Sequence, residues 1–248
     1  MGYKTMDANE AVSRVSYKFT EIAGIYPITP ASPMAEKVDV LASKGEINFW
    51  GNKVKVIEME SEKGAIATVH GALQAGVLAT TYTASQGLLL MIPSIYKMAG
   101  EMLPGVIHVA ARSLSTHSLS IFGDHQDIYA VRQTGACMLS SSSVEEAYHM
   151  AMVSHLASIK SSLPFINFFD GFRTSHEIDK VKEIDLSKLE TLIDKKALRK
   201  FRDNGMISGA TTRGTAENED VYFQHTESRN GYYIKAIDNV IYYCLLYT

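Results

Sequence analysis

Apolar and polar positions repeat along this chain with two spacings, one typical of strands and one typical of helices. Short runs rich in apolar and β-branched residues predict six strands, at about 25–28, 54–59, 77–83, 106–111, 136–139 and 164–169. Apolar residues at helical spacing predict helices at about 7–22, 33–43, 62–75, 86–100, 124–132 and 144–160. Because strands and helices alternate, we predict an α/β fold with a doubly wound, mostly parallel sheet of about six strands and helices on both faces.

Local signals place several of these boundaries. Asp7 and Glu10 have the spacing of a capping box at the start of the first helix, and Gly24 is expected to end it. Pro33 suits the first turn of the second helix. Pro93 lies inside the apolar helix at 86–100, so we expect it to kink that helix or divide it in two.

The character of the chain changes after Gly171. Residues 176–204 are rich in charge, and a helix is predicted at 186–202. Residues 205–233 are polar and rich in Gly, Thr and Asn, so we predict a loop-like segment there. This part is interpreted as an extension that wraps the domain or reaches a partner.

The last stretch, residues 241–248, is apolar and is predicted to be a strand. An exposed apolar strand leaves an edge that invites aggregation, so the pattern favours a truncated chain. We predict one domain at 1–235, with a core at about 7–175 and an extension at about 176–235. Residues 236–248 are predicted to be a divergent tail.

The composition is that of an ordinary globular protein. Hydrophobic residues make up 46% of the chain and charged residues 21%, with a net charge of −3. Acidic and basic residues are interspersed, which argues against a nucleic-acid surface. No apolar run approaches the roughly 18 residues of a membrane span, and the first residues lack the apolar core of a signal peptide. We therefore predict a cytoplasmic protein that binds neither nucleic acid nor membrane.

Metal and phosphate motifs are weak or missing in the sequence. Cys137 and Cys244 are far apart and form no C-x-x-C pair, so this chain is not expected to hold a zinc ion, an iron–sulfur cluster or a disulfide framework. The group His117, Asp124, His125 and Asp127 matches no metal-ligand spacing, and we predict no metal site. The sequence contains neither of the glycine-rich loops that cradle nucleotide phosphates. The segment 83–87 resembles a nucleophile elbow, but Thr83 replaces its first glycine, which argues against hydrolase chemistry.

Three polar side chains follow predicted strands and precede predicted helices. Thr29 lies between Pro27 and Pro30, which makes a stiff loop that presents one hydroxyl group. Glu62 stands at a helix start, and Arg112 directly follows the apolar strand at 106–111. In open α/β folds ligands bind in this position, at the carboxyl ends of the strands. The three side chains suit an anionic oxo-acid beside a nitrogen heterocycle.

Each of these residues also has a structural interpretation. Thr29 is compatible with a simple rigid turn, and the helix dipole by itself favours an acid such as Glu62. Glu58 and Glu60 compete with Glu62, since a longer strand would place all three side chains on one face. A guanidinium at a buried strand end suits a carboxylate ligand. An ion pair between Arg112 and Asp124 or Asp127 would satisfy it equally well.

Longer strings in the chain resemble one family closely. The resemblance runs from about residue 7 to residue 235 and fades beyond about 236. It is carried by YPITPASPM at 26–34, EMESEKGA at 58–65, VHGALQAG at 69–76, TASQGLLLMIPSIYKMAGEMLPGVIHVAAR at 83–112, HSLSIFGDHQDIYAVRQTG at 117–135, PFINFFDGFRTSHEI at 164–178 and RGTAENEDVYFQ at 213–224. These strings resemble the N-terminal, pyrimidine-binding domain of the pyruvate:ferredoxin (flavodoxin) oxidoreductases, which has a thiamine diphosphate-binding fold.

The resemblance implies one piece of a large enzyme. The family uses thiamine diphosphate and iron–sulfur clusters to convert pyruvate and coenzyme A into acetyl-CoA and carbon dioxide, and it passes electrons to ferredoxin or flavodoxin. This domain would hold the pyrimidine half of the cofactor. Magnesium, the diphosphate and the clusters would belong to other domains or subunits of the oxidoreductase. The resemblance also implies a homodimer in the full enzyme, and a chain that is inactive alone.

Roles for single residues follow from the same resemblance. Glu62 matches the family's catalytic glutamate, which hydrogen-bonds the pyrimidine ring. Thr29 and Arg112 match residues that hold the oxygens of pyruvate. Pro27 and Ile28 would shape the cofactor pocket, and Asp124 and His125 would support the site from behind. Two alternatives stay open, namely another 2-oxoacid:ferredoxin oxidoreductase and a non-catalytic or truncated fragment.

Overall fold

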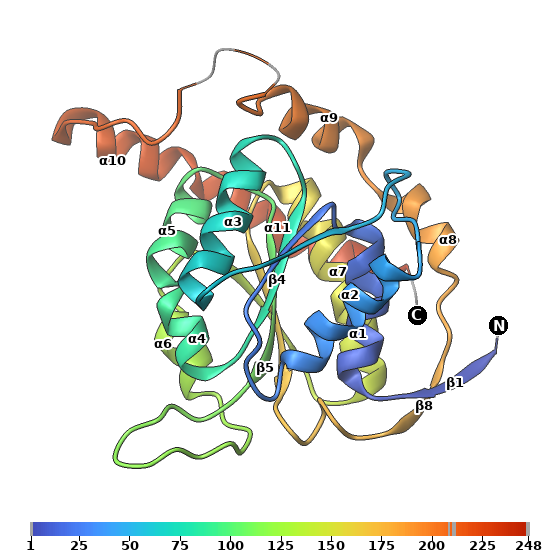
Figure 1. Ribbon diagram of the computed structural model, residues 1–248. Coiled ribbons are helices and arrows are strands. Elements are labelled where there is room, and N and C mark those ends of the chain that lie inside the picture. The colour runs from blue at the N-terminus through green and yellow to red at the C-terminus, as the bar shows by residue number, and fades with distance from the viewer. Residues whose placement is uncertain (1, 208, 210–211, 247–248) are drawn as a thin grey trace.

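A six-stranded parallel sheet forms the centre of the computed structural model, which describes residues 2–207, 209 and 212–246 (Figure 1). The strand order is β3-β2-β4-β5-β7-β6, and each neighbouring pair is parallel. The strands are β2 (Ile22–Ile25), β3 (Lys55–Glu58), β4 (Ala79–Thr83), β5 (Val106–Ala111), β6 (Cys137–Ser141) and β7 (Phe165–Asp170). The predicted α/β fold is confirmed.

Helices cover both faces of this sheet, as Figure 1 shows. One layer contains α1 (Ala8–Phe19), α2 (Ser32–Ser43) and α7 (Val144–Ser161). The other contains α3 (Glu62–Gln74), α4 (Ser85–Leu90), α5 (Ile92–Gly100) and α6 (Gln126–Val131). The helix at 86–100 is divided into α4 and α5 at Met91, with Pro93 in the first turn of α5, as its position predicts.

The direction of winding reverses between β2 and β4. From β2 the chain crosses to β3 on one side, and it then returns past β2 to β4 on the other side. Such a reversal opens a crevice at the carboxyl ends of the two strands. The loops that carry Thr29 and the start of α4 leave the sheet at this crevice.

The predicted bounds of the first helix and strand are wrong by about three residues. Helix α1 ends at Phe19, because the Thr20 hydroxyl and backbone nitrogen both bond to the Ser16 carbonyl oxygen. Strand β2 then occupies Ile22–Ile25 instead of 25–28. Pro27 has no backbone N–H to donate to a neighbouring strand, so the ladder stops before it.

A small second sheet was missed in the sequence. Strand β1 (Tyr3–Met6) pairs antiparallel with β8 (Asp179–Lys182), which joins the N-terminal segment to the start of the extension. The single helix predicted at 186–202 is also wrong. It is broken into α8 (Leu186–Leu189), a 3₁₀ turn η1 (Glu190–Leu192) and α9 (Lys195–Asp203). The break occurs where Asp194 accepts hydrogen bonds from two backbone nitrogens and caps α9.

The predictions for the last forty residues need the largest correction. The segment 205–233 contains α10 (Glu219–Ser228) and the start of α11 (Asn230–Leu245), so it is not a loop. The apolar stretch from 241 is the end of α11 and not a strand, while residues 247–248 lie outside the described part. Ala236 and Tyr243 of α11 are buried, and this helix packs on α7. Helical spacing of its apolar residues outweighs their β propensity.

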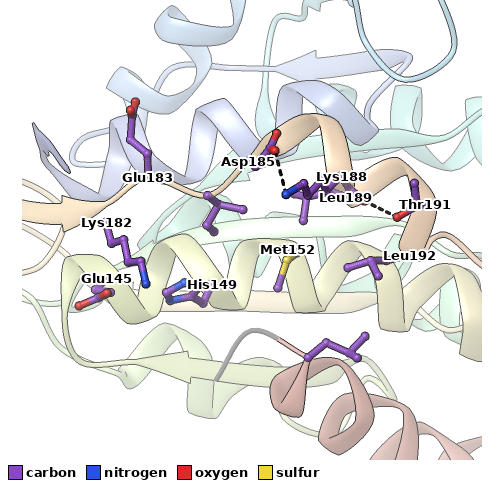
Figure 2. A pocket seen from close by; sticks show the side chains of 12 residues that line it. Glu145, His149, Met152, Lys182, Glu183, Asp185, Lys188, Leu189, Thr191 and Leu192 are labelled. Atoms are coloured by element: carbon purple, nitrogen blue, oxygen red, sulfur yellow. Dashed lines mark hydrogen bonds and ion pairs between the residues drawn. The ribbon is translucent and has the colours of Figure 1, made fainter. Parts of the chain in front are cut away.

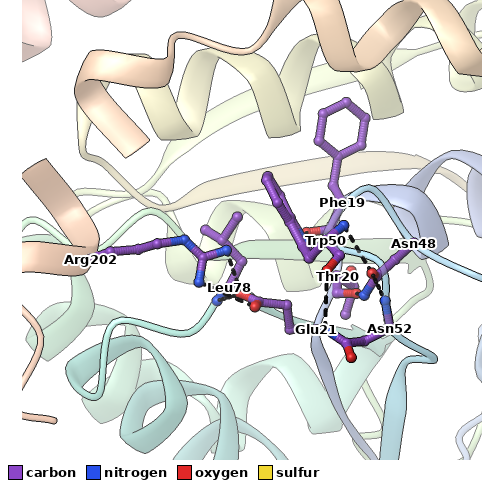
Figure 3. A network of polar contacts seen from close by, with 8 residues as sticks. All are labelled: Phe19, Thr20, Glu21, Asn48, Trp50, Asn52, Leu78 and Arg202. Carbon is purple, nitrogen blue, oxygen red and sulfur yellow. Dashed lines mark hydrogen bonds and ion pairs between the residues drawn. The ribbon is translucent and has the colours of Figure 1, made fainter. Parts of the chain in front are cut away.

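A bidentate ion pair fastens the extension to the amino end of the sheet (Figure 3). Both terminal nitrogens of Arg202 in α9 donate to the Glu21 carboxylate at 3.2 Å, and Glu21 also accepts from the Leu78 backbone nitrogen at 2.9 Å. The guanidinium lies 5.0 Å from the ring centre of Trp50, whose indole nitrogen donates to the Phe19 carbonyl oxygen. One side chain thus joins the extension to residues that precede two core strands.

We expect Arg202→Ala to lower the free energy of unfolding by about 1–2 kcal/mol, because it removes a partly buried charged hydrogen-bond pair and its cover over Trp50. Urea titration would measure the loss. Arg199→Ala removes an exposed cation from the same helix and is the matched control, with little effect expected. Equal stability of the two variants would show that the ion pair does not fasten the extension.

Two buried histidines lie between β5 and α7. Asn167 donates from its amide nitrogen to His108 Nδ1 at 3.1 Å, so His108 must carry its proton on Nε2 and donate it to His155 Nε2 at 3.2 Å. His155 stacks on Phe19 with a ring-centre distance of 5.0 Å. Burial lowers the pKa of His108 to about 3 and also lowers the pKa of His155. Both rings are therefore neutral in the folded protein.

This histidine pair predicts a loss of stability in acid. The unfolded chain binds protons at histidine below pH about 6.5, whereas the folded His108 does not until about pH 3, so stability falls as pH falls between these values. The expected slope is up to about 1.4 kcal/mol per pH unit for each histidine. Urea unfolding at several pH values measures it. His108→Leu should give a shallower slope, and an unchanged slope would exclude His108 as the cause.

Candidate functional site

Arg112 brings the loops after β2 and β5 together. It follows the last residue of β5 and is only 7% exposed, and its Nη1 donates to the backbone carbonyl oxygen of Thr29 at 2.7 Å. The contact uses the Thr29 carbonyl group, and Thr29 itself is exposed at the edge of the sheet. The peptide bond between Thr29 and Pro30 is cis. Two of the three residues singled out in the sequence therefore touch.

Close backbone packing fixes the position of the Thr29 loop. A Cβ atom on Gly171 would lie 2.7 Å from Pro30 Cγ and 2.6 Å from the Ala111 carbonyl oxygen, so only glycine allows this approach. On the other side, the Asn9 amide nitrogen donates to the Pro30 carbonyl oxygen at 3.1 Å. The loop is thus held against the end of β5, directly before Arg112.

A buried carboxylate supports Arg112 through the backbone. Asp127 accepts hydrogen bonds from the backbone nitrogens of Ser85 at 2.7 Å, Arg112 at 3.1 Å and Ile128 at 2.8 Å. Burial raises the pKa of Asp127, and these three N–H groups oppose the rise. Of the two acids considered from the sequence, Asp127 is the one at Arg112. The Asp127 carboxylate accepts from the Arg112 backbone nitrogen, so this hydrogen bond leaves the guanidinium available to a ligand.

Glu62 is the buried member of the three competing glutamates. Strand β3 ends at Glu58, and both Glu58 and Glu60 are exposed, whereas Glu62 is 7% exposed at the first position of α3. Ser61 caps this helix by accepting from the Gly64 backbone nitrogen at 3.2 Å. The capping turn directs Glu62 inward, and this position could not be chosen from strand periodicity.

The Glu62 side chain lies against the start of α4. A Cβ atom on Gly87 would lie 2.8 Å from Glu62 Oε1 and 2.5 Å from Thr83 Oγ1. Glycine is therefore required where the carboxylate passes. The Thr83 hydroxyl is buried and has no hydrogen-bond partner among the described residues. Glu62 is thus placed at the carboxyl end of β4, next to the crevice between β2 and β4.

Charge connects Glu62 with Arg112. Burial lowers the pKa of Arg112, while the negative charges of Asp127 and Glu62 raise it. The guanidinium remains charged at neutral pH, since arginine does not lose its proton in proteins. Its Nε is buried and lacks a hydrogen-bond partner within the described part of the chain. A buried cation with an unused donor is therefore close to a buried anion at one edge of the sheet.

Gln86 is a site residue that sequence reasoning missed. Its Oε1 accepts from Arg112 Nη2 at 3.5 Å, and its Nε2 donates to the Ser115 carbonyl oxygen at 3.1 Å. Ser85 donates to the Ser113 carbonyl oxygen at 2.6 Å. In the sequence this segment was weighed only as a poor nucleophile elbow. No residue-level signal there predicts that Gln86 faces Arg112.

Comparison with known proteins agrees with this geometry. The family described as "Pyruvate flavodoxin/ferredoxin oxidoreductase, thiamine diP-bdg" matches residues 14–241. This chain belongs to that family. The matched part is the family's thiamine diphosphate-binding domain, and it contains every site residue named above except Asn9.

Relatives of this oxidoreductase domain are much longer. The chain is 56% identical over 239 residues to the pyruvate-flavodoxin oxidoreductase of Klebsiella pneumoniae, covering 96% of this chain and 20% of that protein. It is 54% identical over 235 residues to the pyruvate:ferredoxin oxidoreductase of Moorella thermoacetica, covering 94% and 20%. The chain therefore spans about a fifth of the length of these relatives.

A solved structure shares the fold of the oxidoreductase domain. It is a 2-oxoglutarate:ferredoxin oxidoreductase from Magnetococcus marinus with 2-oxoglutarate, coenzyme A and succinyl-CoA bound. The match has a TM-score of 0.66 at 22% identity, and it covers 75% of this chain and 32% of the other. At this identity the likeness supports the fold alone.

The remaining predicted site residues surround this edge less tightly. Pro27 is exposed, and Ile28 is partly buried against the core. Asp124 is exposed and accepts from the Gln126 backbone nitrogen at 3.0 Å. His125 Nε2 pairs with Asp170 at 2.7 Å, at the end of β7. Their contribution to the cofactor and substrate stays a prediction.

Two cavities lie away from this edge. One of about 500 Å³ lies between α7, the segment after β8 and the end of α11, and Figure 2 shows His149 and Met152 of α7 facing it. Another, of about 290 Å³, lies beside Trp50 and Arg202.

The described residues show neither a membrane helix nor a cluster of metal ligands. No helix in this part of the chain has both the length and the apolarity needed to cross a bilayer. No group of three His, Cys, Asp or Glu side chains in the same part could hold a metal ion. The charged groups at Arg112 are its own guanidinium and the carboxylates of Asp127 and Glu62.

The residues present fit the pyrimidine half of thiamine diphosphate. Glu62 is buried, so a flat heterocycle that bound next to its carboxylate would meet little competition from water. Thr83 Oγ1 and Arg112 Nε are buried polar atoms without partners in the described chain, which is typical of groups that bind a ligand.

Proposed function

We propose that this chain supplies the pyrimidine- and substrate-binding edge of a pyruvate:ferredoxin or pyruvate:flavodoxin oxidoreductase. The observation that carries the proposal is the hydrogen bond between Arg112 and the Thr29 carbonyl oxygen at a strand end, with the buried Glu62 close enough for its charge to raise the pKa of Arg112. An anionic oxo-acid beside a nitrogen heterocycle matches these groups. The family membership supports the same assignment.

Glu62 is the catalytic carboxylate in this proposal. It would accept a hydrogen bond from a ring nitrogen of the aminopyrimidine and stabilise the positive charge that develops there. A buried carboxylate does this strongly, because little water screens it. Thiamine diphosphate, when bound, supplies the carbon that attacks the keto group and takes up the electrons released on decarboxylation.

Arg112 and Thr29 hold the substrate in this proposal. The Nε and Nη2 atoms form one edge of the guanidinium, and a carboxylate can accept from both at once. Only the 3.5 Å contact with Gln86 competes for that edge in the described chain, while Nη1 holds the Thr29 loop. The Thr29 hydroxyl would donate to another oxygen of pyruvate. Pro27 and Ile28 would border the pocket, and Asp124 and His125 would support it.

The rest of the reaction belongs to parts of the enzyme outside this chain. Magnesium, the diphosphate site and the iron–sulfur clusters are proposed for the remaining four fifths of a protein as long as the relatives. Coenzyme A as second substrate, ferredoxin or flavodoxin as acceptor, and a homodimeric enzyme are proposed on the same basis. A cytoplasmic location is proposed as well.

A chimera tests this function. In it, residues 1–235 of this chain replace the matching segment of the Klebsiella pneumoniae relative. We expect it to reduce flavodoxin with pyruvate and coenzyme A, and this chain alone to be inactive. Faster turnover of 2-oxoglutarate than of pyruvate would assign the site to another 2-oxoacid. A folded chimera that binds thiamine diphosphate but turns over neither acid would contradict the proposal.

A further inference from the structure

The C-terminal helices carry an unusual share of exposed apolar surface. Of the 22 large hydrophobic side chains that are exposed in the described residues, ten lie between Val221 and Leu246. Scattered single residues of this kind need no explanation, but a concentration of them marks an interaction surface.

Helix α10 is the clearest part of this surface. None of its ten residues is buried. Even its aromatic side chains are exposed, with Tyr222 at 58% and Phe223 at 68%. Figure 1 shows α10 beyond the helical layer, away from the sheet. A short helix that buries nothing has little tertiary support, so its apolar residues have no role within this chain.

The base of α10 is nevertheless attached firmly. The Tyr233 hydroxyl, one turn into α11, donates to the Gly135 carbonyl oxygen at 2.9 Å. Arg229 lies between the two helices, and a Cβ on Gly100 would come within 3.0 Å of its Nη1. Helix α11 then packs on α7. The surface is therefore presented from a fixed position on the domain.

The charge of α10 restricts what can cover it. Glu219 and Asp220 lie in its first turn and Glu227 in its last, while His225 is paired with Glu217. If a second copy of the chain packed its α10 against this α10, these acidic residues would lie close together across the contact. A contact between α10 and a different surface of a second copy would be isologous only if it were repeated about a two-fold axis, and that other surface would then have to complement the acids of α10. A separate apolar groove with basic residues at its rim fits better.

We propose that the exposed apolar side chains Val221, Tyr222 and Phe223 of α10 and Ile234 of α11 are covered by such a groove on the remaining part of the full-length oxidoreductase. This inference rests on the proposed function. The chain spans 20% of the length of its Klebsiella pneumoniae relative, and the family match extends through residue 241, so α10 belongs to the shared domain. The other four fifths of the enzyme is the partner whose presence the family implies for every copy of this domain.

Hydrogen exchange tests the contact without any need for catalysis. The α10 amides should exchange at least tenfold more slowly in the chimera defined above than in this chain alone. Should the chimera fail to fold, the aligned segment of the full-length Klebsiella pneumoniae relative is measured instead. If the α10 amides exchange hydrogen equally fast in the isolated chain and in the chimera or full-length relative, the proposal is overturned, whether or not the enzyme turns over pyruvate.

A pair of matched substitutions tests the chemistry of the face. Phe223→Asp should lower the midpoint temperature of unfolding of the chimera and leave that of the isolated chain unchanged. Ile178→Asp is the control, because Ile178 is 72% exposed and lies outside α10 and α11, and it should change neither midpoint. Dimers of the isolated chain that Phe223→Asp dissociates, seen by light scattering, would show instead that a second copy covers the face.

Discussion

Glu62→Gln in the chimera is expected to slow deuterium exchange at the thiazolium carbon of bound thiamine diphosphate by about 10²–10⁴-fold, the range typical of a lost acid–base group. Glutamine keeps the size of the side chain and its place beside Gly87, so packing should survive. It cannot carry the negative charge that stabilises a protonated ring nitrogen. The exchange is followed by proton NMR after acid quenching, with enzyme saturated in cofactor and without pyruvate.

Glu60→Gln is the control for this experiment. Glu60 is exposed two residues before Glu62, so its removal changes the net charge equally but not the buried site. We expect its exchange rate to stay within about twofold of the unsubstituted chimera, as for other surface changes. If Glu62→Gln also leaves the rate unchanged, Glu62 has no part in activating the cofactor.

Arg112→Ala is expected to reduce kcat/KM for pyruvate by about 100-fold, which corresponds to about 3 kcal/mol for a charge-assisted, bidentate contact. The same variant should keep much of the deuterium exchange measured without pyruvate, because the cofactor carbon does not depend on the substrate carboxylate. Steady-state kinetics and NMR exchange on one preparation separate the two effects.

A conservative variant distinguishes recognition from loop support. Arg112→Lys keeps the positive charge but loses the paired donors. We therefore expect its kcat/KM for pyruvate to lie between the values of Arg112→Ala and the unsubstituted chimera. Arg112 also holds the Thr29 carbonyl oxygen, so a fall in both deuterium exchange and pyruvate use in Arg112→Ala would indicate lost loop support instead of lost substrate recognition. If KM and kcat for pyruvate stay near normal in Arg112→Ala, the substrate assignment is wrong.

The central sheet could be predicted because its signals are local and agree with one another. The strand at Val106–Ala111 is apolar throughout and is buried on both faces, and the prediction of its bounds is confirmed. The predicted start of α7 at residue 144 is confirmed as well, and Ser143 caps this helix by accepting from the Glu146 backbone nitrogen. Such elements need no long-range information.

Other parts of the fold depend on partners far away in sequence. Strand β1 has four residues and exists because β8, more than 170 residues later, pairs with it. The tail from residue 241 has high β propensity, but it is helical because Ala236 and Tyr243 lie on the face that packs on α7. No local pattern fixes either outcome.

The site could be predicted only in outline. Strand-end position selects Thr29 and Arg112, and their contact follows from β2, β4 and β5 being neighbours in the sheet. Selecting Glu62 over its neighbours requires the burial that α3 imposes. The closeness of Gln86 and Gly87 to these groups is set by the turn at the start of α4, where Ser85 has a φ of +50°. Such a conformation is not visible in residue types.

The central claim is that the groups at residues 29, 62 and 112 form one site for the pyrimidine ring and the oxo-acid. A crystal structure of the chimera with thiamine diphosphate and pyruvate tests it most directly. The account predicts a ring nitrogen of the pyrimidine about 2.7–3.0 Å from a Glu62 carboxylate oxygen, and the pyruvate carboxylate at a similar distance from Arg112 Nε. A pyrimidine ring bound at any other edge of this domain, or a pyruvate with no contact to Arg112, would contradict it.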